Sequence, residues 1–273
     1  MQIGYQGEGG SYSHRAVTEV APDADPIGYP TFAAAFAALD ASEIDRLVVP
    51  VENSTTGSVL PVLDRLPGDA DHQSFAIVQE HLVEVRHAII GLPGADIASV
   101  REVRSHPEAL AQAEYYLTEH GIAEVPRNDT AGAVAEVAKL GDPGVAALAP
   151  VWTAEEHGLE VLAADVMDRD HNTTRFVVLA PGAPQVDADD DKTTVLFTTA
   201  HQPGALALVL TELGLRGANL TRIESRPANE AWTYRFFVDL VHEPGPEGLA
   251  RVIDPPPANS AELRVLGSYR AVS

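Results

Sequence analysis

The residues best suited to chemistry lie together in the segment 171–176, which reads His-Asn-Thr-Thr-Arg-Phe. Arg175 can hold a carboxylate through two parallel hydrogen bonds, and Thr174 can donate one hydrogen bond to a second oxygen nearby. The segment opens an apolar run, 176–180, which predicts a buried strand that ends at a Pro-Gly pair. Polar groups at the start of a strand are well placed to bind an anionic ligand. The alternative is that they are surface residues at the strand end without a functional role.

A glycine-rich turn follows the first predicted strand, 2–5, and leads into a predicted helix. Free N–H groups in such a turn, together with the start of a helix, favour an anion. The spacing fits neither of the common nucleotide-binding loops, so an anion site and a plain tight turn both stay open. The candidate residues of this turn are Gly10, Ser11, Tyr12 and Ser13.

A second polar loop follows the short apolar strand predicted at 47–51. Glu52, Asn53 and Ser54 come directly after this strand and stand just before a predicted helix at 59–66. Side chains of this kind either contact a ligand or cap the helix, and a capped helix start that faces a cleft does both.

Two helix starts supply further candidates. Ser105 and Glu108 have the spacing of a capping box for a helix over 109–119, which is a sufficient explanation for both, while His106 is a candidate ligand contact. Thr130 begins another predicted helix, and the small residues around it would let a substrate approach the helix N-terminus.

Strands alternate with helices as far as about residue 180, which predicts an α/β fold with mostly parallel strands. We expect residues 1–181 to form two lobes, with the chain crossing between them near 76 and again near 160. The segment 182–191 is rich in Pro, Gly and Asp and predicts a linker. The order of patterns over 192–273 is βαββαβ, which predicts a ferredoxin-like domain.

The composition excludes several classes of function. The chain of 273 residues has 40 Asp+Glu against 18 Lys+Arg, giving a formal charge of −22, and such a surface repels nucleic acid and anionic membranes. We interpret the acidity as an adaptation to a cytoplasm of high salt. Cysteine is absent, so disulfides and thiolate catalysis are excluded. No signal peptide or long apolar run is apparent, and we expect a soluble cytoplasmic protein.

Taken together, the motifs resemble those of prephenate dehydratases that carry a C-terminal ACT regulatory domain. The resemblance covers nearly the whole chain. In the first part it rests on Tyr5-Gln6-Gly7 with Gly10 and Tyr12-Ser13, Pro50-Val51-Glu52-Asn53-Ser54 with Gly57, Ser105-His106-Pro107, Asp129-Thr130-Ala131, and Asn172 with Thr174-Arg175-Phe176. In the second part it rests on Pro203-Gly204-Ala205-Leu206 and Glu224-Ser225-Arg226-Pro227.

The resemblance implies a two-lobed catalytic domain like that of periplasmic binding proteins, with the active site between the lobes. It implies that prephenate loses CO₂ and its ring hydroxyl to give phenylpyruvate. Aromatisation drives that reaction, so we expect no cofactor and no metal. The resemblance implies that Thr174 acts on the departing hydroxyl. We expect Arg175 to pair with a substrate carboxylate or with Glu52, and the remaining catalytic candidates are Asn53, Ser54 and Thr130. The implied substrate contacts are Gly10, Ser11, Tyr12, Ser13, Ser105, His106, Asn172 and Phe176.

Phenylalanine is the effector that the resemblance implies for the ACT domain. Its expected contacts are Pro203, Gly204, Ala205, Leu206, Asn219, Glu224, Ser225, Arg226 and Pro227. Because such pockets are usually completed by a second subunit, we expect a homodimer or homotetramer. Met1 leads straight into the first strand, so we expect an enzyme without a fused mutase domain. The alternatives are an arogenate dehydratase and a non-catalytic amino-acid sensor.

Overall fold

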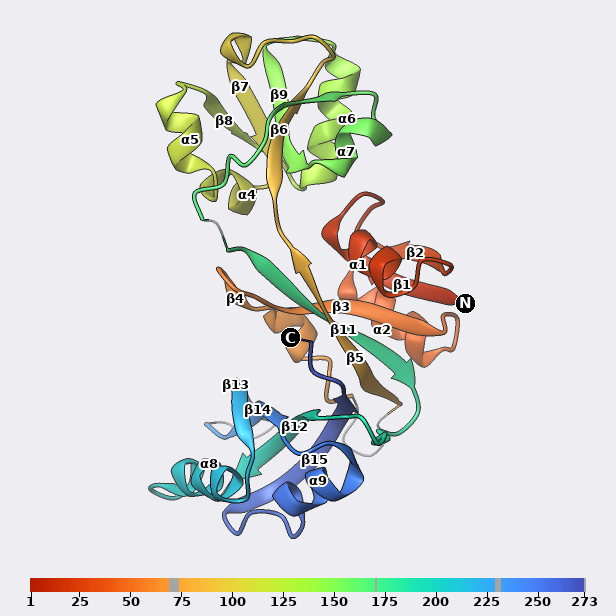
Figure 1. Cartoon of the computed structure of the whole chain (residues 1–273), viewed down its shortest axis with the longest axis vertical. Helices are drawn as coiled ribbons and strands as arrows, with labels where there is room; N and C mark the ends of the chain where they lie inside the picture. The colour runs from red at the N-terminus through yellow and green to blue at the C-terminus, as the bar shows by residue number, and fades with distance from the viewer. Residues whose placement is uncertain (69–73, 170, 229–231, 273) are drawn as a thin grey trace.

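The computed structural model describes residues 1–68, 74–169, 171–228 and 232–272, which form three lobes stacked along the long axis of the molecule (Figure 1). The N-terminal strands lie in the middle lobe, the upper lobe is inserted between two long strands, and the C-terminal residues form the lower lobe. Across the described residues, every helix is too short or too polar to span a bilayer.

The middle lobe begins with three parallel strands joined by two helical crossovers. Its elements are β1 (Gln2–Gln6), α1 (Tyr12–Val20), β2 (Asp25–Tyr29), α2 (Phe32–Asp40), β3 (Arg46–Asn53), β4 (Gly57–Ser58) and α3 (Leu60–Leu63). β1 pairs with β2 on one side and with β3 on the other, so the carboxyl ends of β1 and β3 open at the same sheet edge. That edge carries both polar loops that the sequence singled out.

Two long strands, β5 (Phe75–Glu84) and β11 (Thr173–Pro181), join the middle lobe to the upper lobe. The chain enters the upper lobe through β5 and returns through β11, and the two strands pair antiparallel. β11 also pairs antiparallel with β3, which sets Thr174 opposite Asn53. The sheet register therefore brings together residues that are far apart in the sequence.

The upper lobe is a mixed five-stranded sheet in the order β10-β6-β9-β7-β8, covered by helices. Its elements are β6 (His87–Gly91), the 3₁₀ turn η1 (Ile97–Ser99), β7 (Glu102–Ser105), α4 (Pro107–Ala111), α5 (Glu114–Glu119), β8 (Ala123–Pro126), α6 (Thr130–Leu140), β9 (Val145–Pro150), α7 (Trp152–Glu156) and β10 (Glu160–Ala163). β6 and β9 are buried along their whole length, which explains why their sequences are apolar without alternation.

The single helix predicted over 109–119 is instead the two helices α4 and α5. They are separated at Gln112 and Ala113, and Ala113 has the non-helical angles φ −124° and ψ 15°. The N–H of Asp168 donates to the Gln112 carbonyl at 2.7 Å, and the Asp168 carboxylate accepts the N–H of Tyr115 at 3.2 Å. A segment distant in sequence thus takes the backbone groups that a continuous helix would pair with itself.

The lower lobe has the predicted βαββαβ order, and its strands lie in the sequence β13-β14-β12-β15 of a ferredoxin-like sheet. Its elements are β12 (Lys192–Thr199), α8 (Ala205–Leu215), β13 (Asn219–Pro227), β14 (Tyr234–Val241), α9 (Gly245–Ile253) and β15 (Ser260–Tyr269). Both helices pack on one face of this sheet, while the other face looks toward the middle lobe.

The sheets of the middle and lower lobes are continuous. β15 pairs in parallel with β5 at Gly267 and Ile77, so ten strands form one sheet. Leu266, Leu196 and Phe237 of the lower lobe belong to the same buried cluster as the core of the middle lobe. A Cβ atom at Gly267 would lie 2.0 Å from the Ile77 carbonyl oxygen, so only glycine allows this approach.

We predict that Gly267→Ala lowers the stability of the protein by about 1 to 3 kcal/mol, because the added methyl must push two backbones apart. Thermal unfolding measures the effect. Gly214→Ala in α8 is the matched control, since its Cβ would meet no atom within 4 Å, and its midpoint should stay equal or rise. Equal midpoints for Gly267→Ala and the parent protein would contradict the prediction.

Candidate active site

A cleft of about 320 Å³ lies where the middle and upper lobes meet. The middle lobe and the connecting strands contribute Tyr12, Asn53, Thr56, Val59, Val85, Asn172 and Thr174. The upper lobe contributes His87, His106, Glu108, Ala109, Gln112, Asp129 and Thr130. A second cavity of about 430 Å³ adjoins the cleft and shares four of its residues, and it is also lined by Arg169.

Thr174 is fixed by its neighbour across the sheet. The side-chain amide of Asn53 donates to Thr174 Oγ1 at 3.0 Å. The oxygen of the same Asn53 amide accepts the backbone N–H groups of Thr55 and Thr56 at 2.9 and 3.0 Å, so its orientation is determined. Because Thr174 Oγ1 accepts a hydrogen bond from Asn53, its own proton is left to donate to a group in the cleft.

A chain of amides continues from Asn53 across the cleft. Asn53 also donates to Asn172 Oδ1 at 2.7 Å, and Asn172 in turn donates to Gln112 Oε1 at 2.9 Å. Each oxygen is used as an acceptor, which leaves the amide nitrogen of Gln112 as a donor for a ligand. The chain links the middle lobe to the upper lobe through neutral side chains.

Six of the predicted residues line the cleft together, namely Tyr12, Asn53, His106, Thr130, Asn172 and Thr174. They come from five separate segments and both lobes. His106 caps α4 through its ring, because its Nδ1 accepts the N–H of Glu108 at 3.2 Å. The predicted capping role of Ser105 is therefore wrong, since the cap lies one residue later.

Six predicted site residues lie behind the cleft rather than in its lining. Ser11 caps α1 by accepting the N–H of His14, and the Gly10 carbonyl accepts the indole N–H of Trp152. Ser105 is buried and donates to the Leu148 carbonyl at 2.6 Å. Three more predicted residues also lie behind the cleft. Ser13 is in the first turn of α1, and Phe176 is in the core. Ser54 contacts the backbone of His171 and Thr173.

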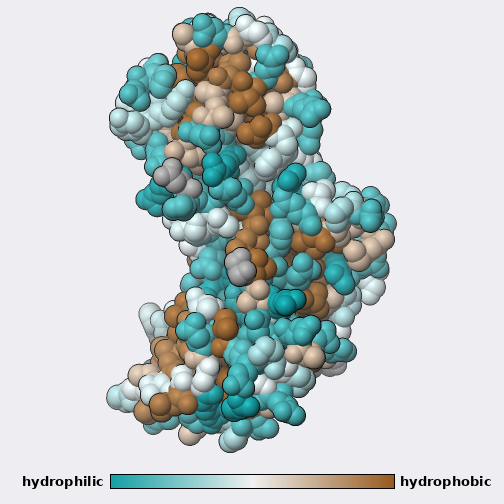
Figure 2. All heavy atoms as spheres, in the orientation of Figure 1, coloured by the Kyte–Doolittle hydropathy of each residue, from teal (hydrophilic) through white to brown (hydrophobic). Residues whose placement is uncertain are grey.

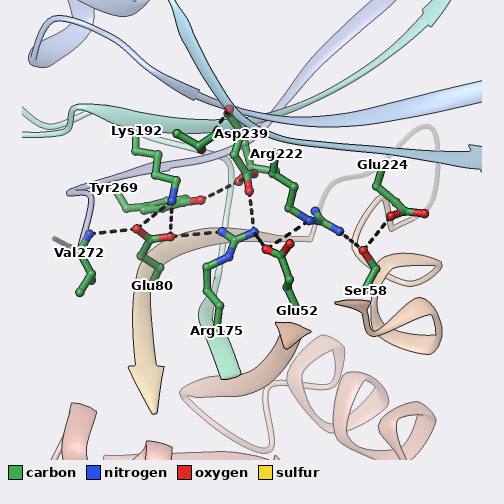
Figure 3. Close-up of polar contacts among 12 residues, drawn as sticks. Glu52, Ser58, Glu80, Arg175, Lys192, Arg222, Glu224, Asp239, Tyr269 and Val272 are labelled. Carbon is green, nitrogen blue, oxygen red and sulfur yellow. Dashed lines mark hydrogen bonds and ion pairs between the residues drawn. The ribbon is translucent and has the colours of Figure 1, made fainter. Parts of the chain in front are cut away.

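Arg175 and Glu52 also lie outside the cleft, and of the two partners expected for Arg175, a substrate carboxylate or Glu52, the structure shows Glu52. Side chains alternate along a strand, so Arg175 points to the opposite face of β11 from Thr174. There its guanidinium contacts Asp239 at 2.6 Å, Glu80 at 3.2 Å and Glu52 at 3.3 Å (Figure 3). The guanidinium is already occupied by carboxylates of the protein itself.

The cluster around Arg175 is buried between the middle and lower lobes. Lys192 Nζ lies 2.7 Å from Glu80, whose side chain is 1% exposed, and the backbone N–H of Val272 donates to the same carboxylate at 2.9 Å (Figure 3). Burial by itself would lower the pKa of Arg175, but the charges of Asp239, Glu80 and Glu52 around it raise its pKa above the usual value. Arg175 is therefore a permanent structural cation.

Two residues of the cleft carried no functional signal in the sequence. Gln112 stands in a predicted helix, and His87 begins an apolar strand. Only the packing of the lobes brings them to the cleft. None of the groups of His, Cys, Asp and Glu among the described residues has the arrangement of a metal site.

Comparison with known proteins decides the family. Residues 3–183 match the family model for prephenate dehydratase, and residues 193–254 match that for the ACT domain. The chain belongs to the prephenate dehydratase family. It is thus a carbon–oxygen lyase, and the lower lobe is its ACT domain.

Similar proteins span nearly all of this dehydratase. A prephenate dehydratase of Mycolicibacterium vanbaalenii is 37% identical over 94% of this chain and 84% of that protein. Arogenate dehydratase 2 of Petunia hybrida is 34% identical over 98% of this chain and 71% of that protein. The structure of an Arthrobacter aurescens prephenate dehydratase in complex with L-Phe is 31% identical, with a TM-score of 0.82, over 99% of this chain and 90% of that one.

The two segments expected to bind an effector belong to different elements of the ACT domain, the start of α8 and the strand β13. Pro203, Gly204, Ala205 and Leu206 line an open cavity of about 410 Å³ at the start of α8. On β13, Glu224 accepts a hydrogen bond from Ser58 at 2.7 Å and Arg226 pairs with Asp64 at 2.8 Å, so both face the catalytic domain. The remaining candidates on β13 are the outward-facing residues Asn219, Ser225 and Pro227.

Proposed function

We propose that the cleft between the catalytic lobes converts prephenate to phenylpyruvate, with Thr174 as the donor to the departing ring hydroxyl. The supporting observation is the hydrogen bond from Asn53 to Thr174 Oγ1, which leaves the threonine proton to point at a ligand. Accepting that bond also polarises the hydroxyl and strengthens it as a donor.

The reaction balances without a cofactor. The C–C bond to the ring carboxylate breaks, its electron pair moves into the ring, the ring double bonds shift, and the C–O bond to the hydroxyl breaks. CO₂ leaves, and the departing hydroxide takes a proton from solvent to become water. Negative charge develops on the departing oxygen, where an oriented neutral donor such as Thr174 lowers the barrier. An alcohol is too weak an acid to be expected to give up its proton fully.

Thr174→Ala should lower kcat about 10² to 10³-fold with a small effect on KM, because one transition-state donor is lost. Thr174→Ser keeps the hydroxyl and is the matched control, for which we expect most of the activity to remain. Steady-state assays of phenylpyruvate formation measure both variants. An alanine variant with near-normal kcat would refute the assigned role.

Substrate carboxylates meet few cations in this cleft. Across the described residues that line the two adjoining cavities, Arg169 is the one arginine or lysine. Thr130 stands at the start of α6, where Asp129 accepts the N–H of Gly132 at 2.6 Å and the other N–H groups of the first turn stay free for an anion. We therefore assign carboxylate binding to Arg169 and the N-terminus of α6 rather than to Arg175.

Arogenate is the second candidate substrate. It carries an ammonium group in place of the keto oxygen of prephenate, and the acidic side chains of Glu108 and Asp129 line the cleft. A carboxylate near that ammonium would favour arogenate. Parallel measurements of kcat/KM for prephenate and arogenate decide between the two substrates, and a higher value for arogenate would overturn the assignment to prephenate.

We propose that L-phenylalanine is the effector of the ACT domain and that its site lies between two subunits. The Pro203–Leu206 cavity is open, and Ser225 faces outward on the edge strand β13, so a second copy could supply what one chain lacks. Exposed apolar side chains gather on the same lobe, and Figure 2 shows apolar surface at the lower left, over α8. They include Leu208, Leu215, Ile223, Trp232 and Tyr234. On this basis we propose a homodimer or homotetramer.

Contacts from β13 are the route by which the effector would reach the catalytic residues. Arg222 donates to Ser58 at 3.0 Å and lies 3.6 Å from Glu52, whose neighbour in the chain is Asn53 (Figure 3). Movement of β13 on effector binding would therefore be felt beside the residue that orients Thr174. A coupling of about 1 to 3 kcal/mol, corresponding to 5 to 150-fold inhibition, is typical for such linked sites.

We predict that phenylalanine inhibits the enzyme and that Arg222→Gln weakens this inhibition while phenylalanine still binds. Calorimetry measures the binding, and initial rates with and without phenylalanine measure the inhibition. Arg216→Gln is the control, because that arginine contacts only residues of the ACT domain. The proposed route fails if Arg222→Gln is inhibited as strongly as the parent enzyme.

We also propose that the acidic surface suits the enzyme to a cytoplasm of high salt. The repulsion that a net charge of −22 implies is screened over about 10 Å at 0.1 M salt but over about 3 Å at 1 M. The midpoint of thermal unfolding should therefore rise with KCl concentration. A midpoint that is flat from low to molar KCl would contradict the proposal.

A further inference from the structure

His87 is the one described side chain of the cleft that has buried polar atoms without partners. Its side chain begins β6 and lines the cleft, and the residue is 4% exposed. Neither Nδ1 nor Nε2 has a hydrogen-bond partner in the described structure. Leaving a buried polar group unpaired lowers stability by about 1 to 3 kcal/mol. For the stability of the fold alone, leucine would therefore be a better residue at this position of the apolar strand.

A second buried histidine shows what a purely structural role looks like in this protein. His242 is 6% exposed, but its Nδ1 lies 2.7 Å from the Glu243 carbonyl oxygen and its Nε2 lies 2.8 Å from Thr193 Oγ1. Both of its nitrogens are satisfied by the protein. His87 lacks such partners, which indicates that its partner is a ligand of the cleft.

The surroundings of His87 define which chemistry it offers. Tyr12 packs its ring edge against the imidazole with the centroids 5.5 Å apart, and Trp152 packs edge-on against Tyr12 at 5.3 Å. Burial in this aromatic setting lowers the pKa of His87 to about 4. The imidazole is thus neutral near pH 7 and carries one N–H donor and one acceptor nitrogen.

We propose that the N–H of His87 donates to the keto-acid carboxylate of the substrate, taking prephenate as the substrate of the proposed function. Prephenate has two carboxylates, and the one on the ring is lost as CO₂ during the reaction. A donor that holds the departing carboxylate would oppose its loss, whereas a donor to the keto-acid carboxylate keeps its bond from substrate to product.

The first test separates binding from chemistry. In His87→Leu the KM for prephenate and the Kd for phenylpyruvate should both rise roughly 10 to 150-fold, as expected for one hydrogen bond to a charged group, while kcat changes little. Thermal stability should not fall, because an apolar side chain replaces unpaired polar atoms. Unchanged KM and Kd in His87→Leu, or a loss of stability alone, would overturn the proposal.

Variants with a side-chain amide at position 87 should restore the hydrogen bond that His87→Leu removes. Asparagine places its side-chain nitrogen near the position of Nδ1, and glutamine places its nitrogen near that of Nε2, so one of His87→Asn and His87→Gln should recover most of the binding. His242→Gln is the matched control and should change stability but not KM. Equal loss of binding in all three His87 variants would argue for a role in packing instead.

The second test does not depend on turnover. The full-length enzyme, labelled with ¹⁵N in the imidazoles of its ten histidines, is titrated with phenylpyruvate and followed by NMR. The resonances of His87, identified by their absence from His87→Leu, should shift, while those of His242 stay in place. Resonances of His87 that do not move at saturating phenylpyruvate would refute the contact. If the parent enzyme did not turn over prephenate, the proposed function would fail, and this titration would still decide the role of His87.

Discussion

The structure depends on a cluster of charges buried where the ACT domain meets the catalytic domain. Arg175 and Lys192 stand against Glu80 and Asp239, and each of the two carboxylates is only 1% exposed. Charges withdrawn from water are tolerated only when they are paired, and removal of one member of such a pair typically costs about 3 to 5 kcal/mol. The four groups come from both domains, so the observed placement of the ACT domain is the one in which each charge meets a partner.

The alternation of a β-strand gives this cluster its second importance. Thr174 and Asn53 face the cleft, while their chain neighbours Arg175 and Glu52 face the ACT domain. A shift of β11 or β3 by one residue would exchange the two faces. One strand register therefore places both the residues that face the cleft and the residues that contact the ACT domain.

The sequence predicted the α/β class, the βαββαβ domain and six residues of the cleft, because strand periodicity, helix caps and polar loops are local signals. It offered Glu52 as a partner of Arg175 but did not predict Glu80 and Asp239, because these two carboxylates are far away in the chain and lie in ordinary strands. Gln112 and His87 were missed for the same reason, since only the packing of two lobes brings them to the cleft.

The backbone pairing of Gly267 with Ile77 affects how this enzyme can be recombined. An effector domain joined through a flexible tether can be exchanged between enzymes by cutting in the tether. Here the segment 182–191 is not the only connection, because β15 and β5 share a sheet and the lobes share a core. A chimera that kept its fold would need both sides of this shared sheet and core from the same parent. We therefore expect the two domains to have diverged as a unit rather than as interchangeable modules.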